Sequence, residues 1–392
     1  MDFKLTEAEL NWRNEIRDFL RRELPPEVES SLEDADSDEQ WRFAVEFNRK
    51  LGQRGWLTVA WPKEYGGQAR SFIEQLIFNE EMAYWRAPLG PSSFGINFVG
   101  PTIIVHGTEE QKRQHLPLIA RGEVTWCQGF SEPNAGSDLA SLQTRAVEDG
   151  DYFIITGQKI WTTNAHRAQW CLLGARTNPD VPKHRGISLF LVEMNRPGIT
   201  VQPIYNMADI HNFNQVFFDN VRVPRSNMVG EKDRGWYAMM TTLDFERSGV
   251  QYAAGGRRTL EELVSFTREA TRNGQPLARN VVVRHKLAEM AIEVEVARML
   301  AYRVASMQAR GLIPNYESSM SKLFGTELTQ RLANTGMQIL GLYGQLEPKS
   351  KWAPLKGRIE RMYLTSFAAT IAAGTSEIQR NIIALRGLGL PR

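Results

Sequence analysis

The first 120 residues carry apolar side chains at the spacing of amphipathic helices. Thr6 and Glu9 stand three residues apart, in the pattern of a capping box, before a run with apolar residues at 10, 16, 19 and 20. The Pro25-Pro26 pair is expected to end this helix. Further helices are predicted over about 38–54, 73–84 and 109–120. The pattern therefore indicates an N-terminal helical domain at residues 1–121.

Between about 122 and 225 the pattern changes to short runs of β-branched and aromatic residues, separated by Gly, Pro and Asn. Tyr152–Thr156 follows Glu148–Asp151, a segment typical of a hairpin turn. Other strands are predicted at 170–173, 186–192 and 215–218. Strands at this spacing favour a compact antiparallel sheet or barrel, so we expect a middle β domain at residues 122–231.

Long helical patterns return from about residue 232. They predict helices over 235–270, 280–310, 317–342 and 357–371, each long enough to be one member of a four-helix bundle. The C-terminal domain is therefore expected at residues 232–392. The fold class is α+β, in the order N-terminal helical domain, barrel-like antiparallel β domain and C-terminal four-helix bundle.

Composition and charge restrict the function classes. The chain has 392 residues, of which 42% are hydrophobic and 23% charged, as in a folded protein with a large core. The net charge is +2 and no basic stripe is present, so a nucleic-acid platform is not expected. Two cysteines and an N-terminus without a basic, apolar leader lead us to expect a cytoplasmic location. No run of 18 apolar residues predicts a membrane span.

Common catalytic motifs are missing from the sequence. The six histidines, at 106, 115, 166, 184, 211 and 285, lie at no metal-ligand spacing to another His or Cys, so no metal site is expected. There is no Walker A motif and no Gly-x-Ser-x-Gly elbow. Gly387–Leu390 lacks the third glycine and the following helix of a dinucleotide fingerprint. NAD-dependent, P-loop and serine-hydrolase functions therefore have no support.

Two segments combine small polar residues with apolar surroundings. Phe130–Leu139 (FSEPNAGSDL) follows a predicted strand and offers hydroxyls and a Gly-Ser step whose backbone N–H groups can meet an anionic ligand. Gly157–Asn164 (GQKIWTTN) places an indole beside hydroxyl donors. Taken alone, each segment is better explained as an ordinary turn.

Together with Ala373–Arg380 (AGTSEIQR), these two segments resemble the signature motifs of the acyl-CoA dehydrogenase family of flavoenzymes. The spacing of the three motifs and the order of the domains match that family over nearly the whole chain. The resemblance implies an FAD cofactor, an acyl-CoA substrate and an electron-transfer flavoprotein as acceptor. The implied reaction is α,β-dehydrogenation to a trans-2-enoyl-CoA, as in the β-oxidation of fatty acid or steroid side chains.

The resemblance also implies which residues contact the cofactor. Ser131 and Thr163 would lie near the polar edge of the flavin ring, with Trp161 packed against it, and Ser137 near the FAD phosphates and the pantetheine of the substrate. The rest of the implied cofactor set is Phe130, Gly136, Arg272, Gln338, Gly341, Thr375 and Glu377. Of these, Thr375 and Glu377 would approach the adenosine half, while Gln338 and Gly341 would serve a neighbouring subunit.

The reaction requires a base for the α-proton and a donor that polarises the thioester carbonyl. Many family members carry the base as a Glu immediately before the Gly-Thr of the C-terminal signature, where this chain has Ala373, so only a backbone N–H is expected to act there. A smaller branch of the family places the Glu on the first bundle helix, and Glu246 matches it. Arg247 and Asp244 match positions beside the substrate cleft.

Two departures from the family pattern bear on assembly. Residues 271–276 replace an Arg-x-x-Phe-Gly segment, which leaves Arg272 as the candidate substitute, and Leu342 replaces a glycine after Gly341. Some bacterial relatives that act on steroid or other bulky CoA thioesters diverge similarly and pair two unlike subunits. We therefore expect either a homo-oligomer or a heterotetramer with a related subunit. A half-site or structural subunit and an oxygen-using acyl-CoA oxidase remain the alternative functions.

Overall fold

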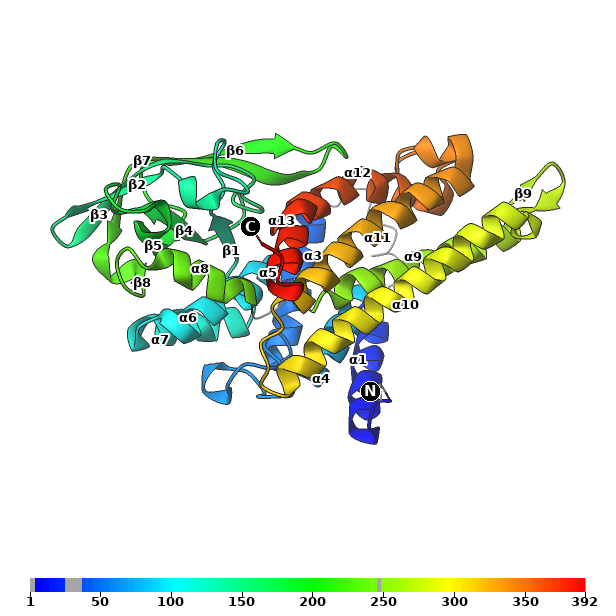
Figure 1. Ribbon diagram of the computed structural model, residues 1–392, viewed down its shortest axis with the longest axis horizontal. Coiled ribbons are helices and arrows are strands. Elements are labelled where there is room, and N and C mark those ends of the chain that lie inside the picture. The colour runs from blue at the N-terminus through cyan, green and yellow to red at the C-terminus, as the bar shows by residue number, and fades with distance from the viewer. Residues whose placement is uncertain (1–3, 25–36, 245–247, 392) are drawn as a thin grey trace. The chain divides into compact units, whose positions relative to one another are not determined.

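The computed structural model describes residues 4–24, 37–244 and 248–391, and the chain forms two compact units (Figure 1). The first unit holds Met1–Ala35, Arg70–Ala87 and Arg247–Arg392, and the second holds Asp36–Ala69 and Pro88–Glu246. The boundaries predicted at 121 and 231 from local pattern stay a prediction.

The second unit is built on a sheet that has eight strands among the described residues, in the order β6-β7-β3-β2-β4-β5-β8 with β1 beside β4 (Figure 1). The strands are β1 Trp126–Gly129, β2 Arg145–Asp149, β3 Tyr152–Lys159, β4 Trp170–Arg176, β5 Ile187–Glu193, β6 Ile199–Tyr205, β7 His211–Pro224 and β8 Met228–Val229. The predicted hairpin joins β2 to β3 through Gly150, whose φ is 59°. Most pairs are antiparallel as predicted, but β1 runs parallel to β4.

Both faces of this sheet are covered, and this explains why β5 is buried at six successive positions, 187–192. Leu172, Leu189 and Leu191 belong to one core cluster, while Phe190 and Val192 point into another. Residues of η3, α6, α7 and α8 complete the first cluster. The helical elements of this unit include α3 Asp38–Gln53, η2 Lys63–Tyr65, α5 Gly90–Phe94, η3 Gly95–Val99, α6 Gly100–His106, α7 Glu109–Ala120 and α8 Gly235–Asp244.

The first unit is a helical bundle that includes the N-terminal helix. Its helices are α1 Glu7–Glu23, α4 Phe72–Tyr84, α9 Val250–Glu269, α10 Val281–Ala309, α11 Tyr316–Leu340, α12 Arg358–Ile371 and α13 Ser376–Ile382, with the hairpin strands β9 Thr271–Arg272 and β10 Gln275–Pro276 after α9. Leu263, Leu287, Leu332 and Ile359 belong to the core of the bundle. The predicted capping box of Thr6 and Glu9 is present at the start of α1.

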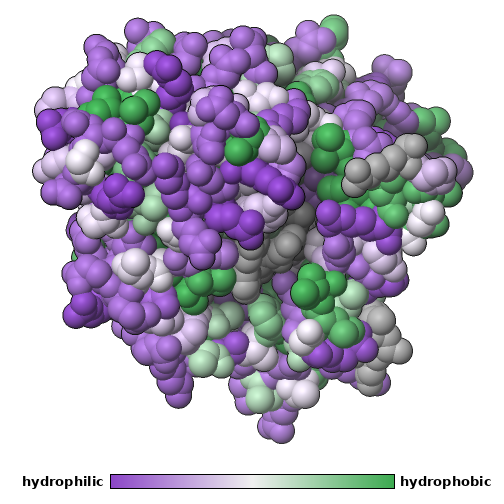
Figure 2. Space-filling model, turned by 60° about the vertical axis from the view of Figure 1, so that its left-hand side comes forward, coloured by the Kyte–Doolittle hydropathy of each residue, from purple (hydrophilic) through white to green (hydrophobic). Residues whose placement is uncertain are grey.

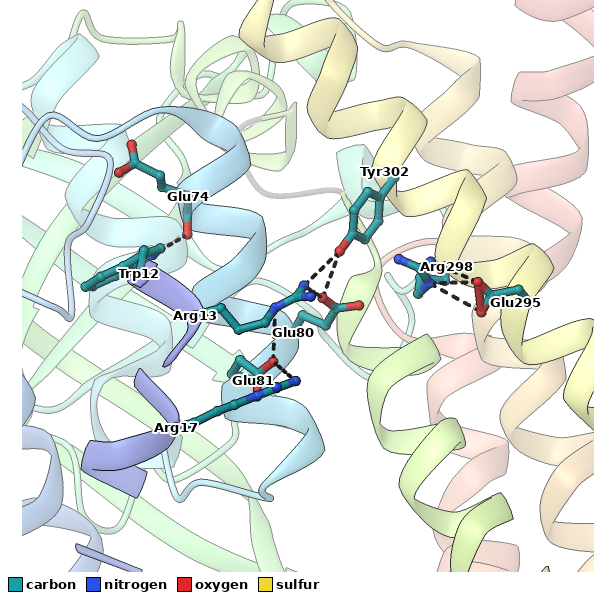
Figure 3. A network of polar contacts seen from close by, with 9 residues as sticks. All are labelled: Trp12, Arg13, Arg17, Glu74, Glu80, Glu81, Glu295, Arg298 and Tyr302. Carbon is teal, nitrogen blue, oxygen red and sulfur yellow. Dashed lines mark hydrogen bonds and ion pairs between the residues drawn. The ribbon is translucent and has the colours of Figure 1, made fainter. Parts of the chain in front are cut away.

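A polar network attaches α1 to the rest of this unit (Figure 3). Arg13 contacts Glu80 of α4 at 2.5 Å and the hydroxyl of Tyr302 of α10 at 3.1 Å. The Arg17 guanidinium donates two hydrogen bonds to the Glu81 carboxylate, at 2.9 and 2.8 Å. Glu81 is 3% exposed, so its carboxylate lies largely out of water, whereas the Arg17 side chain is 38% exposed.

The prediction of one helix over 235–270 is wrong. Helix α8 ends at Asp244 and α9 begins at Val250 after Gly249, which has a φ of 73°. A residue in the left-handed region cannot continue a right-handed helix, and glycine adopts that conformation at the least cost. A Cβ at position 249 would also lie 2.7 Å from Ser321 Oγ.

None of the helices within the described ranges is both long and apolar enough to cross a membrane. Within the same ranges, no three or more His, Cys, Asp or Glu side chains are arranged to hold a metal ion.

Candidate cofactor and substrate site

The segment after β1 forms a tight turn in the second unit. Glu132 and Ala135 exchange two backbone hydrogen bonds, at 3.1 and 3.0 Å, so the chain reverses between them. Ser131 is half-buried before the turn, and Gly136 and Ser137 are exposed after it. A Cβ at Gly136 would meet no atom within 4 Å. The turn therefore leaves its hydroxyl and backbone groups accessible to a ligand.

Trp161 stands in a second turn of the same unit, after the end of β3. Its φ is 59°, and its indole is 57% exposed and lies edge-on to Phe213 at 6.1 Å. A bulky residue with positive φ is rare, and such strain is concentrated at functional sites. The next two residues, Thr162 and Thr163, are buried and half-buried.

A buried ion pair lies beneath both turns. The Lys159 ammonium contacts Glu132 Oε1 at 2.7 Å and donates to the Phe130 carbonyl at 3.1 Å. The carboxylate also accepts hydrogen bonds from the backbone N–H groups of Gln143 at 2.6 Å and Thr144 at 2.9 Å. Lys159 is 0% exposed and Glu132 is 8% exposed.

Burial and pairing act in opposite directions on the pKa values of this pair. Burial lowers the pKa of Lys159 to about 8, although the Glu132 carboxylate favours its charged form. Burial also raises the pKa of Glu132, but Lys159 and the backbone donors lower it further, so the net pKa is below its usual range. Both groups are therefore held in their charged forms near neutral pH.

Asn214 of β7 holds the Trp161 turn from the other side. The Thr162 N–H donates to the Asn214 carbonyl at 2.9 Å, and Asn214 Nδ2 donates to the Thr162 carbonyl at 3.0 Å. The same amide contacts His166 Nδ1 at 3.1 Å and His211 Nε2 at 2.9 Å, and the two imidazoles stack at 4.0 Å. Asn214 is fully buried, so the turn has a rigid support.

The C-terminal signature forms a turn of the first unit between α12 and α13. Ala373 and Gly374 both have positive φ, 52° and 86°. Gln379 Nε2 donates to both of their carbonyls at 3.1 Å, and Lys322 Nζ donates to Gly374 O at 2.8 Å. Thr375 caps α13 through its side chain. The exposed Ala373 backbone is thus fixed by side chains behind it.

A pocket of about 400 Å³ opens beside this turn. It is lined by Glu327, Gln330, Arg331, Thr370, Ile371, Thr375, Ser376, Glu377 and Arg380. Ser376 is buried, and its Oγ meets no hydrogen-bond partner within the part of the chain that the structure describes. The pKa of Glu377 is lowered, mainly by its own backbone N–H and by the Thr375 hydroxyl. Two arginines, three hydroxyl side chains and two carboxylates in this lining suit a ligand that carries phosphate and sugar hydroxyl groups.

Three other predicted residues meet at one end of α11 in the first unit. Arg272 Nη2 donates to the Ile339 carbonyl at 3.2 Å, and a Cβ at Gly341, whose φ is 64°, would lie 3.2 Å from the same guanidinium. Gln338 is exposed and contacts Lys286. Arg272 and Gly341, which are separate candidates in the sequence, therefore lie side by side.

The remaining predictions fall at the end of α8. Glu246 and Arg247 lie outside the described residues, and Asp244 is the last residue of α8.

The other predicted residues divide between the units. Phe130, Ser131, Gly136, Ser137, Trp161 and Thr163 belong to the second unit, and Arg272, Gln338, Gly341, Ala373, Thr375 and Glu377 belong to the first.

The residues present fit the chemistry of FAD, the cofactor that the motifs imply. An exposed indole offers a flat face to an aromatic ring. Thr162 Oγ1 and Ser376 Oγ are buried hydroxyls that have no hydrogen-bond partner among the described residues, and buried polar groups of this kind are normally satisfied. A polar ligand bound at the Trp161 turn would satisfy Thr162, and one bound at the start of α13 would satisfy Ser376.

Sequence reasoning assigned no role to the groups that hold these turns. Lys159, Asn214, Gln379 and Lys322 all act on the backbone of a predicted motif. One signal was available, because Lys159 has the same inward-facing parity as Phe153 once the strand predicted over 152–156 is extended to the end of β3 at Lys159. A charged residue at such a position requires a buried partner.

Comparison with known proteins agrees with the order of the elements. Models of the N-terminal, middle and C-terminal domains of acyl-CoA dehydrogenases match residues 6–123, 127–221 and 233–388. The chain is 37% identical over 407 aligned positions to acyl-CoA dehydrogenase FadE26 of Mycobacterium tuberculosis, covering 100% of this chain and 99% of the relative.

Solved structures of similar proteins share the fold over their full length. The ChsE4-ChsE5 complex from Mycobacterium tuberculosis contains a chain with a TM-score of 0.91 and 37% identity, and the Tcur3481-Tcur3483 steroid ACAD gives 0.91 and 35%. Each match covers 100% of both chains. The predicted helical, β and helical-bundle fold is confirmed, and the chain belongs to the acyl-CoA dehydrogenase family of FAD-dependent oxidoreductases.

Proposed function

We propose that this chain is an FAD-dependent acyl-CoA dehydrogenase that forms a trans-2-enoyl-CoA, with Glu246 as the base for the α-proton. The observation that carries this choice of base is the alanine at position 373. It stands on the turn before the Gly-Thr pair and presents a methyl group and a fixed backbone, with no carboxylate. Glu246 follows α8 by two residues and supplies the carboxylate that the reaction requires.

The proposed chemistry divides between two protein groups. The Glu246 carboxylate takes the α-proton, and the electron pair of that C–H bond becomes the second bond between Cα and Cβ. When bound, FAD supplies the acceptor for the hydride that leaves Cβ. The Ala373 N–H donates to the thioester oxygen, where negative charge develops as the α-proton leaves. The contacts of Gln379 and Lys322 with this turn favour a preorganised donor.

The proposed contacts with the cofactor are assigned within each unit by itself. Ser131, Thr163 and Trp161, with the neighbouring Phe130 and Gly136, would hold the flavin ring. The pocket that contains Thr375 and Glu377 would take the adenosine half, with Arg272, Gln338 and Gly341 serving the cofactor of a neighbouring subunit. Ser137, Asp244 and Arg247 would line the path of the CoA thioester.

A bulky substrate is favoured over a short straight chain. Ala372 and Ala373 leave little side-chain volume at the C-terminal turn. One of the similar structures is a steroid ACAD, with 35% identity to this chain. We therefore propose a branched or ring-bearing acyl group, from steroid catabolism rather than from an ordinary fatty acid.

Assembly with a related subunit is part of this proposal. Figure 2 shows a largely hydrophilic face on which hydrophobic residues gather in small patches. Leu342, Tyr343 and Trp352, beyond the end of α11, are 82%, 62% and 67% exposed. We propose these exposed side chains as candidates for contact with a protein partner. One similar structure is a complex of two differently named proteins, ChsE4 and ChsE5, which supports a heterotetramer here.

The base is tested by anaerobic bleaching of the flavin with a steroid-derived CoA thioester. Glu246→Gln should retain FAD and lose bleaching rate by about 10²- to 10⁴-fold, the usual contribution of a general base. Glu269→Gln, an exposed glutamate at the end of α9, is the control and should bleach at the parent rate. Undiminished bleaching in Glu246→Gln rules out this base.

Two further measurements separate the alternatives. A chain purified alone with about one FAD per protomer argues against a half-site subunit, whereas FAD retained only after co-purification with a related subunit supports it. Peroxide production in air would identify an oxidase. Reduction of an electron-transfer flavoprotein without peroxide supports the dehydrogenase.

A further inference from the structure

The buried Glu132–Lys159 pair connects the two turns of the second unit that carry the proposed flavin contacts. Glu132 is the residue after Ser131, and Lys159 precedes Trp161 by two positions. The ammonium reaches the Glu132 carboxylate at 2.7 Å and the Phe130 carbonyl at 3.1 Å. The Lys159 side chain, at the start of the second turn, therefore contacts the first turn at two residues, Phe130 and Glu132.

A backbone hydrogen bond also joins the two turns. The Ile160 N–H donates to the Ser131 carbonyl at 2.9 Å, immediately beside the ion pair. The carboxylate is fixed from its other side by the backbone N–H groups of Gln143 and Thr144. Each carboxylate oxygen therefore has at least one donor within the protein, which restricts the geometry of the pair.

A purely structural role does not account for the position of this pair. Breaking a buried ion pair by removing one partner is strongly destabilising, whereas replacing both partners by neutral groups often costs little. A charged pair is therefore an unnecessary way to stabilise a core. It is an effective way to fix the spacing of two turns, because charge-assisted hydrogen bonds are short and directional. The strained Trp161 turn, with φ of 59°, needs such support.

We propose that Glu132 and Lys159 are positioning residues that hold the Ser131 turn and the Trp161–Thr163 turn at the spacing required to contact one flavin ring from two sides. The flavin part of this inference rests on the proposed function. The pair itself touches neither substrate nor cofactor and acts through the backbone of the two turns. Its loss should loosen both turns together.

The first test is Lys159→Met, which keeps the length of the buried chain and removes the ammonium. Hydrogen exchange, measured without added FAD, should be at least tenfold faster at the backbone amides of residues 130–132 and 160–163. The dissociation constant for FAD should rise at least tenfold, and the bound flavin spectrum should move toward that of free FAD. Parent-like exchange at both turns overturns the proposal.

Two further variants separate positioning from stability. The double variant Glu132→Gln/Lys159→Met leaves no charge buried alone, so it should regain much of the melting temperature lost in Lys159→Met while both turns still exchange rapidly. Gln111→Met removes three side-chain hydrogen bonds in the same unit: two donated to the carbonyls of Ser226 and Met228 and one accepted from the Thr108 N–H. It should lower the melting temperature and leave exchange at the two turns and the flavin spectrum unchanged.

The outcomes also distinguish this inference from the proposed function. If Gln111→Met accelerates exchange at the two turns as much as Lys159→Met does, the effect is general loosening and the positioning role fails. If the parent chain, with its partner subunit, binds no FAD while Lys159→Met still loosens both turns, the connection stands and the cofactor assignment fails.

Discussion

At the scale of single residues, strain is found at two of the three motifs. Trp161 and Ala373 have φ values of 59° and 52°, a conformation that costs a non-glycine residue of order 1–3 kcal/mol. Asn214 and Gln379 donate to the backbone around them and offset this cost. The sequence could not predict the strain, because neither Trp nor Ala prefers the left-handed region. Resemblance identified the motifs without explaining their geometry.

A buried histidine should make stability depend on pH. His115 is 3% exposed and packs edge-on against Trp126 at 5.3 Å and Trp170 at 4.7 Å. Burial lowers its pKa to about 4 from an ordinary 6.5. Between these values the unfolded chain binds a proton that the folded chain does not. Stability should therefore fall as the pH drops from 6.5 to 4, by at most about 3 kcal/mol.

The contribution of His115 can be isolated with His115→Phe, which keeps an aromatic ring and removes the titration. Urea unfolding at pH 7 and pH 5 should show that the parent loses about 2 kcal/mol more than this variant over that interval. His285→Gln removes an exposed histidine of α10 and should keep the parent dependence. Equal losses in the parent and His115→Phe would contradict the assignment.

At the scale of elements, local pattern predicted most helices and strands. It failed where glycine and proline determine where a helix begins or ends. The hairpin between β2 and β3 was predicted because Asp-Gly pairs favour its turn. The helical segments between 90 and 106 were missed, since Pro91, Pro101 and three glycines at 90, 95 and 100 disguise the periodicity. The break at Gly249 was missed because a glycine within a helical pattern is ambiguous.

Two glycines of the α9 region should respond oppositely to alanine. Gly249→Ala places a Cβ in the left-handed region, 2.7 Å from the Ser321 hydroxyl, which is held by a 2.6 Å hydrogen bond to Ser248 O. We expect a loss of about 2 kcal/mol. Gly255 lies inside α9, and a Cβ there would meet no atom within 4 Å. Gly255→Ala should gain about 0.5–1 kcal/mol.

Urea unfolding of both variants tests this difference, with circular dichroism as the measure of helix content. The two changes add the same methyl group to the same region, so they control for each other. If Gly249→Ala is as stable as Gly255→Ala, the left-handed break between α8 and α9 is not required by the fold.

At the scale of the whole molecule, the chain joins segments that are distant in sequence, and local pattern is uninformative about such pairing. Residues before 36 and between 70 and 87 belong with the C-terminal helices in one unit. Periodicity shows that α1 has a buried face but not what covers it. Prediction of the site from sequence has the same limit. The hydrogen bond from the Ile160 N–H to the Ser131 carbonyl joins two motifs that are separate in the sequence.

The attachment of α1 to α4 gives a last prediction. Arg17 pairs with Glu81, whose side chain is 4% exposed, whereas Arg21 of the same helix pairs with Asp18 in a contact where both side chains are about 60% exposed. Removing Arg17 leaves a carboxylate out of water with a remaining contact to Arg13 Nε at 3.3 Å. Arg17→Met should therefore cost about 2–4 kcal/mol, and Arg21→Met less than about 0.5 kcal/mol.

The free energy of unfolding of each variant in urea provides the measurement. If the cost of Arg17→Met comes from stranding the carboxylate, Arg17→Met/Glu81→Gln should recover a large part of it, because the neutral amide is less costly to bury. A double variant as unstable as Arg17→Met would instead attribute the loss to the contacts of the arginine stem with α4. Equal stability of Arg17→Met and Arg21→Met would mean that apolar burial of α1, through Trp12, Ile16 and Phe19, is sufficient to attach this helix.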